Sequence, residues 1–201
     1  MCHVKDKCGV ATCLLVWVLS LGTWGGTLAL VTNKQVWTFT VVVVLLLVFH
    51  LKCVFGDPGR LESSGTLLFE EETCVICNAP KKLRTHHCFS CGVCVLNMDH
   101  HCEWINNCVG FYTQKHFILF LFYVVLGCLG SLGMILTELT NNFPEPSNCF
   151  VLLFSVLILV FSALFLLASS SMLYDQLSLV VNNTSTIDQL QQRTFEKVTL
   201  K

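Results

Sequence analysis

The amino-acid sequence predicts an all-α membrane protein in which four apolar segments cross the bilayer and a long cysteine-rich loop joins the second to the third. The 201 residues are 54% hydrophobic and only 12% charged, which is too apolar for an ordinary soluble domain. The apolar residues collect in long uncharged runs, as in membrane helices. Seven of the thirteen cysteines fall in one stretch between two of these runs.

Four apolar runs approach or reach the length of a membrane-spanning helix. They cover residues 10–31, 36–51, 117–136 and 149–168. A spanning helix needs about 20 residues. The second run is shorter, but it can extend to Phe55 because the side chain of Lys52 can reach the membrane interface. Its valines favour a strand in water, yet a single segment in lipid must be helical to satisfy its own backbone.

The first run could instead be a secretory signal peptide, since Lys5 and Lys7 precede it. Its apolar part is longer than the roughly 7–15 residues of such a peptide. No small-residue cleavage site precedes a plausible soluble domain. We therefore expect a retained helix.

Lysine and arginine are distributed unevenly around these segments. Eleven of the twelve lie in the N-terminal tail, in the loop between the second and third segments, or in the C-terminal tail. Basic residues accumulate on the cytosolic side of a membrane, so we expect both termini and the middle loop in the cytosol. The net charge of −1 does not suggest nucleic acid as a partner, and the lipid bilayer is the partner that the composition implies.

These expectations divide the chain into five parts. They are a cytosolic N-terminal tail (1–9), the first two membrane helices (10–55), a cytosolic cysteine-rich domain (56–116), the last two membrane helices (117–174) and a short cytosolic tail (175–201).

Cysteine and histidine are concentrated in the middle loop, between residues 74 and 108. Cytosolic thiols stay reduced, so a disulfide framework is not expected there. The C-x2-C pairs Cys74/Cys77 and Cys88/Cys91, followed by Cys94, suit thiolates that converge on zinc, which prefers four ligands in a tetrahedron. A loop so poor in large apolar side chains is not expected to fold without metal.

Two closed zinc sites need eight ligands, which six of the seven loop cysteines and two of its four histidines would supply. One cysteine and two histidines would then remain for chemistry, although the count alone does not say which. The consecutive residues Asp99-His100-His101-Cys102 fit either a metal site or a nucleophile with its base, or both.

The stretch CVICNAPKKLRTHHCFSCGVCVLNMDHHCEWINNCVGF, residues 74–111, resembles the cysteine-rich domain of the DHHC protein S-acyltransferases. Asp57-Pro58-Gly59 after the second helix and the four-segment topology add to the resemblance. The implied fold has four transmembrane helices with a cytosolic zinc-stabilised loop domain between helices two and three. The resemblance also implies two zinc ions, one held by Cys74, Cys77, His87 and Cys94 and the other by Cys88, Cys91, His101 and Cys108.

The same resemblance implies the chemistry. Cys102 would be the nucleophile, His100 its base, and Asp99 the group that orients the base. The co-substrate would be palmitoyl-CoA or another long-chain acyl-CoA, and the acceptors would be cysteines of membrane-associated proteins. The implied location is an endomembrane, Golgi or endoplasmic reticulum. The residues that would hold acyl-CoA are not identified by the resemblance.

Several positions depart from the family pattern, among them the residue after Cys102 and the segment after the fourth helix. Glu103 follows the nucleophile where proline is usual, and a carboxylate beside a thiol disfavours the thiolate. The segment Ser185-Thr186-Ile187-Asp188 is the nearest match to a Thr-Thr-x-Glu motif. The same residues could cap a short helix whose apolar stripe lies on the membrane or on the zinc loop.

Other functions remain open from the residues alone. The zinc loop could be a non-catalytic scaffold or regulatory module on a membrane anchor. A RING-type ubiquitin ligase also binds two zinc ions through interleaved ligands, although its usual spacing is absent. The basic residues Lys81, Lys82 and Arg84 could bind the phosphates of coenzyme A or only be solvated.

Overall fold

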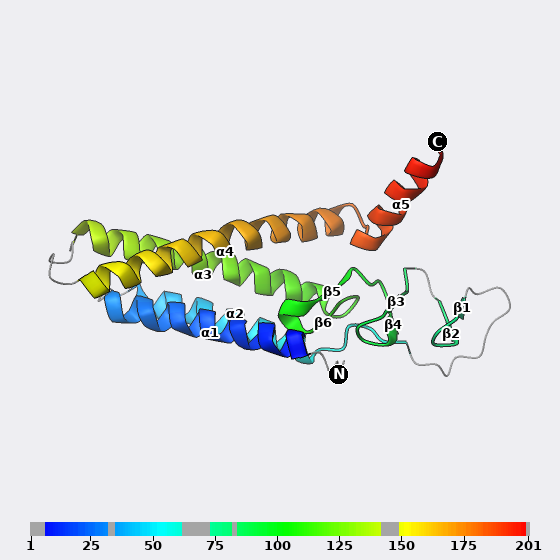
Figure 1. The fold of residues 1–201 in the computed structure, drawn as a ribbon, viewed down its shortest axis with the longest axis horizontal. Coiled ribbons are helices and arrows are strands. Elements are labelled where there is room, and N and C mark those ends of the chain that lie inside the picture. Colours follow the sequence, from blue (N-terminus) through cyan, green and yellow to red (C-terminus); the bar gives the residue numbers. More distant parts are fainter. Residues whose placement is uncertain (1–6, 32–34, 62–72, 82–83, 142–148, 200–201) are drawn as a thin grey trace. The chain divides into compact units, whose positions relative to one another are not determined.

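The computed structural model describes residues 7–31, 35–61, 73–81, 84–141 and 149–199 (Figure 1). Its helices are α1 (Lys7–Leu30), α2 (Val36–Phe55), η1 (Glu103–Ile105), α3 (Gln114–Asn141), α4 (Cys149–Val181) and α5 (Thr186–Thr199). Its strands are β1 (Thr73–Cys74), β2 (Ala79–Pro80), β3 (His86–Cys88), β4 (Val93–Val95), β5 (His100–Cys102) and β6 (Asn107–Val109). The chain divides into two compact units.

Four of these helices, α1 to α4, are long and apolar enough to cross a membrane. The cysteine-rich segment lies between the second and the third of them. The predicted fold class is therefore confirmed, and the chain is a multi-pass membrane protein. Four of the basic residues that predict its orientation, Lys5, Lys34, Lys82 and Lys201, lie outside the described residues.

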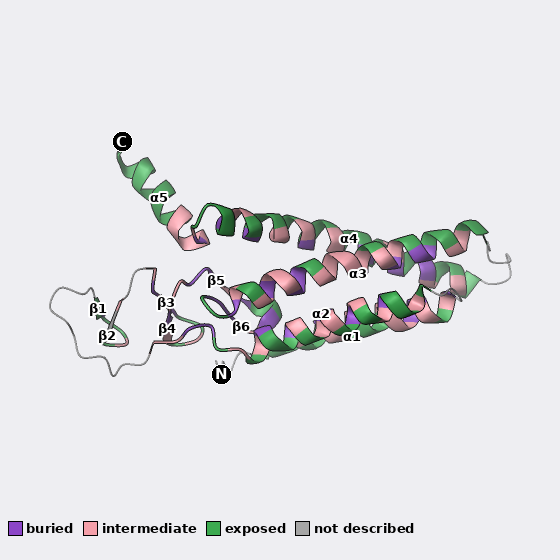
Figure 2. Ribbon diagram, turned by 180° about the vertical axis from the view of Figure 1, so that it is seen from behind, coloured by how far each residue is buried: buried purple, intermediate pink, exposed green. Residues whose placement is uncertain are grey.

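One unit comprises residues 14–49 and 118–175, the larger parts of α1 to α4, which run side by side (Figure 1). Phe39, Val43 and Met134 form a buried apolar cluster between α2 and α3. Exposed residues run along all four helices (Figure 2), and many of them are large and apolar. Helices that bury little apolar surface among themselves need an apolar surrounding, which lipid supplies.

Polar groups inside this unit pair with one another across the helices. The hydroxyl of Thr27 on α1 lies 3.2 Å from that of Ser131 on α3, and Ser162 on α4 donates to Ser131 at 3.5 Å. Such pairing is required because lipid offers no partner to a hydroxyl group.

The other unit comprises residues 1–13, 50–117 and 176–201, and its described part contains the strands, the helix ends and α5. Its strands form three antiparallel hairpins, β1–β2, β3–β4 and β5–β6. Two of these hairpins place a histidine opposite a cysteine, His87 opposite Cys94 and His101 opposite Cys108. Backbone pairing thus brings a histidine and a cysteine seven positions apart within reach of a common metal site in each hairpin.

Candidate functional site

The two C-x2-C segments fold into similar turns. The backbone N–H of Asn78 donates to the carbonyl of Cys74, and that of Gly92 donates to the carbonyl of Cys88, both at 2.8 Å. Asn78 and Gly92 have φ angles of 50° and 68°, in the left-handed region that asparagine and glycine tolerate best. Each turn therefore directs two thiols of one pair toward the same point.

Side-chain alternation along β3 explains why the two clusters interleave in sequence. Successive residues of a strand point to opposite faces. His87 consequently joins the first cluster, while its neighbour Cys88 joins the second. The first cluster contains Cys74, Cys77, His87 and Cys94, and the second contains Cys88, Cys91, His101 and Cys108.

The geometry of both clusters fits a tetrahedral zinc ion. Within each cluster the four ligand atoms lie within 4.8 Å of one another. The Nδ1 atom of His87 lies 3.2 to 3.9 Å from the three sulfur atoms of its cluster, and Nδ1 of His101 lies 3.4 to 3.7 Å from those of its own. Zinc–sulfur and zinc–nitrogen bonds at tetrahedral angles would separate sulfur from nitrogen by about 3.6 Å. The clusters can therefore hold metal ions.

The same alternation places His100 and Cys102 on the opposite face of β5 from His101. Cys102 is buried, with 3% of its surface exposed. The ring of His100 makes an edge contact with Phe117, with 5.6 Å between ring centroids. A three-residue strand thus separates a metal ligand on one face from a histidine–thiol pair on the other.

Asp99 is a buried carboxylate with three hydrogen-bond donors around it. Its Oδ2 accepts from His100 Nδ1 and from Gln176 Nε2, each at 2.8 Å. Its Oδ1 accepts from the backbone N–H of Thr186 at 2.6 Å. Burial disfavours the charge, but the bonds from His100, Thr186 and Gln176 outweigh it and lower the pKa of Asp99 to about 2. Asp99 is therefore ionised at neutral pH.

The environment of His100 favours its charged form. Burial disfavours the imidazolium, but the hydrogen bond with Asp99 and the interaction with Cys102 raise the pKa of His100 to about 9. An ionised carboxylate only accepts, so Nδ1 carries the proton in the bond to Asp99. Nε2 is buried and makes no hydrogen bond of ordinary geometry within the described residues, so its interaction with Cys102 is looser than the one with Asp99. An imidazolium beside a thiol favours the reactive thiolate.

The side chain of Glu103, which replaces the usual proline, is exposed. Its backbone carbonyl accepts a hydrogen bond from the hydroxyl of Thr12 at 2.5 Å. The carbonyl of the next residue, Trp104, lies 3.0 Å from Nε2 of His50. These contacts hold η1 by its backbone, while water screens the Glu103 charge from its surroundings.

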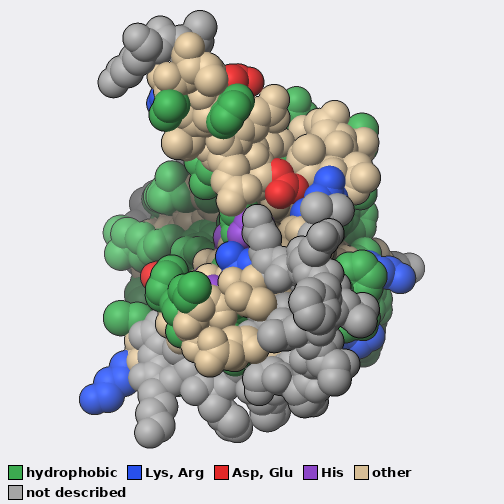
Figure 3. All heavy atoms as spheres, turned by 90° about the vertical axis from the view of Figure 1, so that its right-hand side faces the viewer, with side chains coloured by type: hydrophobic (Ala, Val, Ile, Leu, Met, Phe, Trp, Pro, Cys, Tyr) green, Lys and Arg blue, Asp and Glu red, His purple; other side chains and the backbone are tan. Residues whose placement is uncertain are grey.

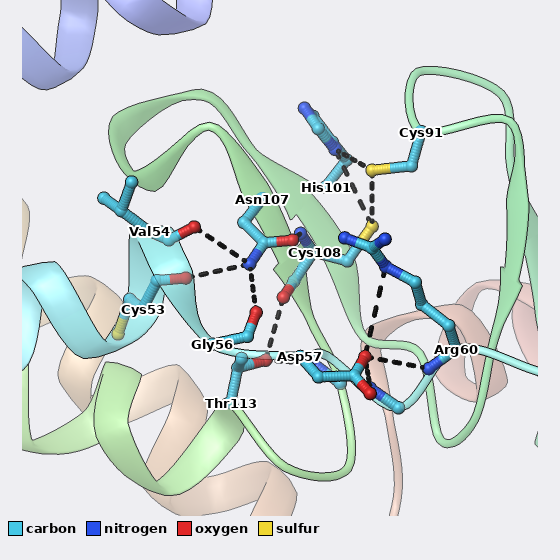
Figure 4. Close-up of polar contacts among 12 residues, drawn as sticks. Cys53, Val54, Gly56, Asp57, Arg60, Cys91, His101, Asn107, Cys108 and Thr113 are labelled. Atoms are coloured by element: carbon cyan, nitrogen blue, oxygen red, sulfur yellow. Dashed lines mark hydrogen bonds and ion pairs between the residues drawn. The ribbon is translucent and has the colours of Figure 1, made fainter. Parts of the chain in front are cut away.

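Asn107 connects the second cluster to the end of α2 (Figure 4). Its amide group donates to the carbonyls of Cys53 at 2.9 Å and Gly56 at 2.8 Å, and its Oδ1 accepts from the N–H of Cys108 at 2.9 Å. The last carbonyls of a helix lack partners inside the helix. Asn107 supplies one and thereby fixes ligand Cys108 against the membrane helix.

The Asp57-Pro58-Gly59 turn follows directly after α2. Oδ1 of Asp57 accepts from the backbone N–H groups of Gly59 at 3.0 Å and Arg60 at 3.1 Å (Figure 4). Gly59 has a φ of 102°, which favours glycine. The turn leads the chain from the helix into the cysteine-rich domain.

The segment Ser185–Asp188 caps α5 and also contacts the site. Asp188 N–H donates to Ser185 Oγ at 3.1 Å, and Ser185 N–H donates to Asp188 Oδ2 at 2.9 Å, which is a reciprocal capping box. The cap interpretation is thus confirmed, and Thr186 between them bonds Asp99.

The apolar residues of α5 divide between two environments. Ile187 packs on a buried cluster that contains Cys88 and Cys108. Leu190, Phe195 and Val198 are 56%, 71% and 70% exposed, and Figure 3 shows apolar side chains on this helix. The first turn of α5 therefore lies on the cysteine-rich domain.

Arg84 holds the turn between α4 and α5. Its Nε lies 3.3 Å from Oδ2 of Asp188, and its guanidinium donates to both the side chain and the backbone carbonyl of Asn183. Its charge is therefore engaged within the protein, which disfavours a role in binding coenzyme A.

All eleven predicted site residues are described. Eight fall into the two clusters, and Asp99, His100 and Cys102 lie together beside the second. Gln176, Asn107 and His50 were not predicted as site residues. A signal for Gln176 existed, because Ser155, Ser162, Ser169 and Gln176 recur every seven residues and mark one polar face of an apolar helix.

This fold and site define a class of multi-pass membrane proteins in which two Cys3His clusters adjoin an Asp–His–Cys constellation. The family model for DHHC palmitoyltransferases matches residues 68–193, more than half of the 201 residues. The chain belongs to this family.

Curated proteins from animals and plants are similar to the chain. Palmitoyltransferase ZDHHC3 of Homo sapiens is 32% identical over 165 residues, with 72% of this chain and 55% of the relative covered. Palmitoyltransferase ZDHHC3-A of Danio rerio is 31% identical over 168 residues, with 72% and 52% covered. Probable protein S-acyltransferase 15 of Arabidopsis thaliana is 39% identical over 119 residues, with 54% and 47% covered. The chain spans about half the length of these relatives.

Proposed function

We propose that this protein is a protein-cysteine S-palmitoyltransferase that moves a long-chain acyl group from acyl-CoA to Cys102 and then to cysteines of membrane-associated proteins. The observation that carries the proposal is the Asp99–His100–Cys102 arrangement, with Nδ1 of His100 held by the carboxylate at 2.8 Å. Membership of the DHHC palmitoyltransferase family supports it.

Before the first step the thiol proton of Cys102 passes to His100, and in the step itself the resulting thiolate forms a bond to the thioester carbonyl carbon. The bond between that carbon and the sulfur of coenzyme A breaks. The coenzyme A thiolate then receives the proton from His100. Asp99 holds the ring and stabilises its charge throughout.

In the second step a cysteine of the acceptor protein gives its proton to His100 and attacks the acyl carbon on Cys102. The new thioester forms as the bond to Cys102 breaks, and the proton returns to Cys102. The two steps together conserve the thioester, so no other reactant is needed.

Each Cys3His cluster would hold one zinc ion, and binding would supply folding free energy to a domain with a small apolar core. The residues that would hold it are Cys74, Cys77, His87 and Cys94 in one cluster and Cys88, Cys91, His101 and Cys108 in the other. The metal-bound hairpins would then keep His100 and Cys102 on one face of β5.

The charge distribution supports a cytosolic position for both termini and for the cysteine-rich domain, since ten of the twelve basic residues lie there and an eleventh, Lys52, lies in the last turn of α2. Acyl-CoA and the acceptor cysteines are cytosolic reactants. We place the protein in a Golgi or endoplasmic reticulum membrane, because uncharged apolar runs of about 20 residues suit these thinner bilayers.

The two-step scheme is tested by isolating the acylated protein. Purified protein loaded with a labelled palmitoyl group and freed of acyl-CoA should pass the label to a lipid-anchored peptide that contains one cysteine. Cys102→Ser should neither load nor transfer, whereas Cys149→Ser, which replaces an exposed thiol, should do both. Transfer from acyl-CoA to the peptide by Cys102→Ser would rule out an acyl-enzyme at this residue.

A non-catalytic scaffold is the second candidate, and the observation in its favour is that Glu103 stands after Cys102 where the family usually has proline. A protein that binds two zinc ions but accepts no acyl group in this assay would have that role.

A further inference from the structure

Gln176 is a buried amide on the apolar helix α4, with 3% of its surface exposed. Its Nε2 donates to Oδ2 of Asp99 at 2.8 Å. Both residues belong to the same compact unit. The amide thus reaches from the end of a membrane helix to the carboxylate that holds His100.

The other buried polar residues on this face of α4 have different partners. Ser155 and Ser169 donate to carbonyls one turn earlier on the same helix, and Ser162 donates to Ser131. Gln176 is the member of the series that bonds a residue of the cysteine-rich domain. Its contact therefore serves the site, whereas the serines of this face bond their own helix or the hydroxyl of Ser131 on α3.

The hydrogen bonds at Asp99 fix the orientation of its carboxylate. A carboxylate oxygen has about two lone-pair directions, and Oδ2 uses them for His100 and Gln176. The donor from Gln176 therefore determines which direction remains for His100. Loss of that donor would leave the carboxylate free to tilt and to draw the imidazole away from Cys102.

The oxygen of the Gln176 amide is not satisfied in the same way as its nitrogen. Oε1 of Gln176 is buried and has no hydrogen-bond partner within the part of the chain that the structure describes. The amide cannot turn over, because Oε1 would then face an ionised carboxylate. An unsatisfied buried acceptor destabilises the fold, which offsets part of the stabilisation that the amide donor gives to the buried Asp99 carboxylate.

We propose that Gln176 is a positioning residue for acyl transfer, which holds the Asp99 carboxylate so that His100 presents Nε2 to Cys102. The inference rests on the proposed function. Gln176 acts through Asp99 and His100 and does not contact the reacting atoms.

The test is a double-mutant cycle on the rate of Cys102 acylation at saturating palmitoyl-CoA. Gln176→Met has a side chain of similar length without a donor and should slow acylation by about tenfold or more, with an unchanged KM for acyl-CoA. In an Asp99→Ala background the same substitution should change the rate by less than about twofold, because the group it positions is gone. Gln192→Met, at an exposed position on α5, is the matched control and should leave the rate unchanged.

Zinc content reports whether each variant is folded. If Gln176→Met loses zinc, Gln176→Asn replaces it, since the amide is kept but one methylene shorter and should not reach Asp99. Gln176→His keeps an N–H at similar reach and should recover most of the rate. Equal slowing in both backgrounds, a raised KM alone, or a wild-type rate in Gln176→Met would overturn the positioning role. Absence of acylation in the wild-type protein would instead overturn the proposed function, and the inference with it.

Discussion

His100 and Cys102 share one face of β5, while His101 between them faces the metal cluster. Successive residues of a strand point to opposite faces, so the stretch 99–102 can supply a metal ligand on one face and the catalytic histidine and thiol on the other. Asp99 sets the ring of His100 through a 2.8 Å hydrogen bond and is itself held by Thr186 and Gln176. Contacts from Gln176 on α4 and Thr186 on α5 thus hold the carboxylate that orients His100 beside Cys102.

His100→Ala and Asp99→Ala should differ in their effect on acylation. His100→Ala removes the base and should slow Cys102 acylation by roughly 10²–10⁴-fold. Asp99→Ala loses orientation but keeps the base, so it should slow the reaction less. Single-turnover measurements with labelled palmitoyl-CoA separate the two. A larger loss in Asp99→Ala, with zinc content unchanged, would contradict the roles assigned.

Glu103 should have little influence on the rate, because its side chain is exposed. A charge screened by water interacts weakly with its neighbours. We expect Glu103→Gln to change the acylation rate by less than about twofold at physiological salt. The comparison is best made at two salt concentrations. A severalfold acceleration that shrinks at high salt would show that the carboxylate does repel the thiolate.

At the scale of the elements, short hairpins position the side chains of the cysteine-rich domain, a role that a hydrophobic core has in most domains. The strands are two or three residues long, and their pairing brings each histidine opposite a cysteine of its own cluster. Because β3 contributes to both clusters, the loss of one metal ion should disturb the other. Asn107 then ties the second cluster to the end of α2.

Zinc content should follow the ligand assignment. We expect two zinc ions per chain in the wild-type protein, and a loss of metal with unfolding of the cysteine-rich domain in Cys74→Ser or Cys88→Ser. Cys102→Ser is the matched control, because it removes a buried thiol of the same domain that is not a ligand, and it should retain both ions. Elemental analysis of purified protein measures this. Loss of one ion from Cys102→Ser would show that the assignment is wrong.

At the scale of the molecule, four apolar helices carry a metal-binding domain that would face the cytosol. The orientation can be measured in sealed microsomes with a membrane-impermeant thiol reagent. After zinc removal, the reagent added outside should label cysteines between residues 74 and 108. A cysteine introduced by substitution at Ser147, which lies between α3 and α4 in the sequence, should stay protected. The opposite pattern would invert the topology.

Much of this architecture was predictable from the sequence. Long uncharged runs reveal membrane helices because lipid admits few alternatives, and the density of cysteine and histidine reveals metal clusters because zinc demands four such ligands. Partners far apart in the chain could not be predicted. Nothing in the apolar pattern of α4 pairs Gln176 with Asp99, and nothing near Arg84 indicates that it bonds Asn183 and Asp188.

The central claim is that Cys102 carries the acyl group, and intact-protein mass measurement after incubation with palmitoyl-CoA tests it most directly. We predict that the wild-type protein with two zinc ions gains one palmitoyl group, that neutral hydroxylamine removes it because it is a thioester, and that Cys102→Ser gains none. An unmodified mass for the zinc-loaded wild-type protein, or an equal gain in Cys102→Ser, would contradict the account.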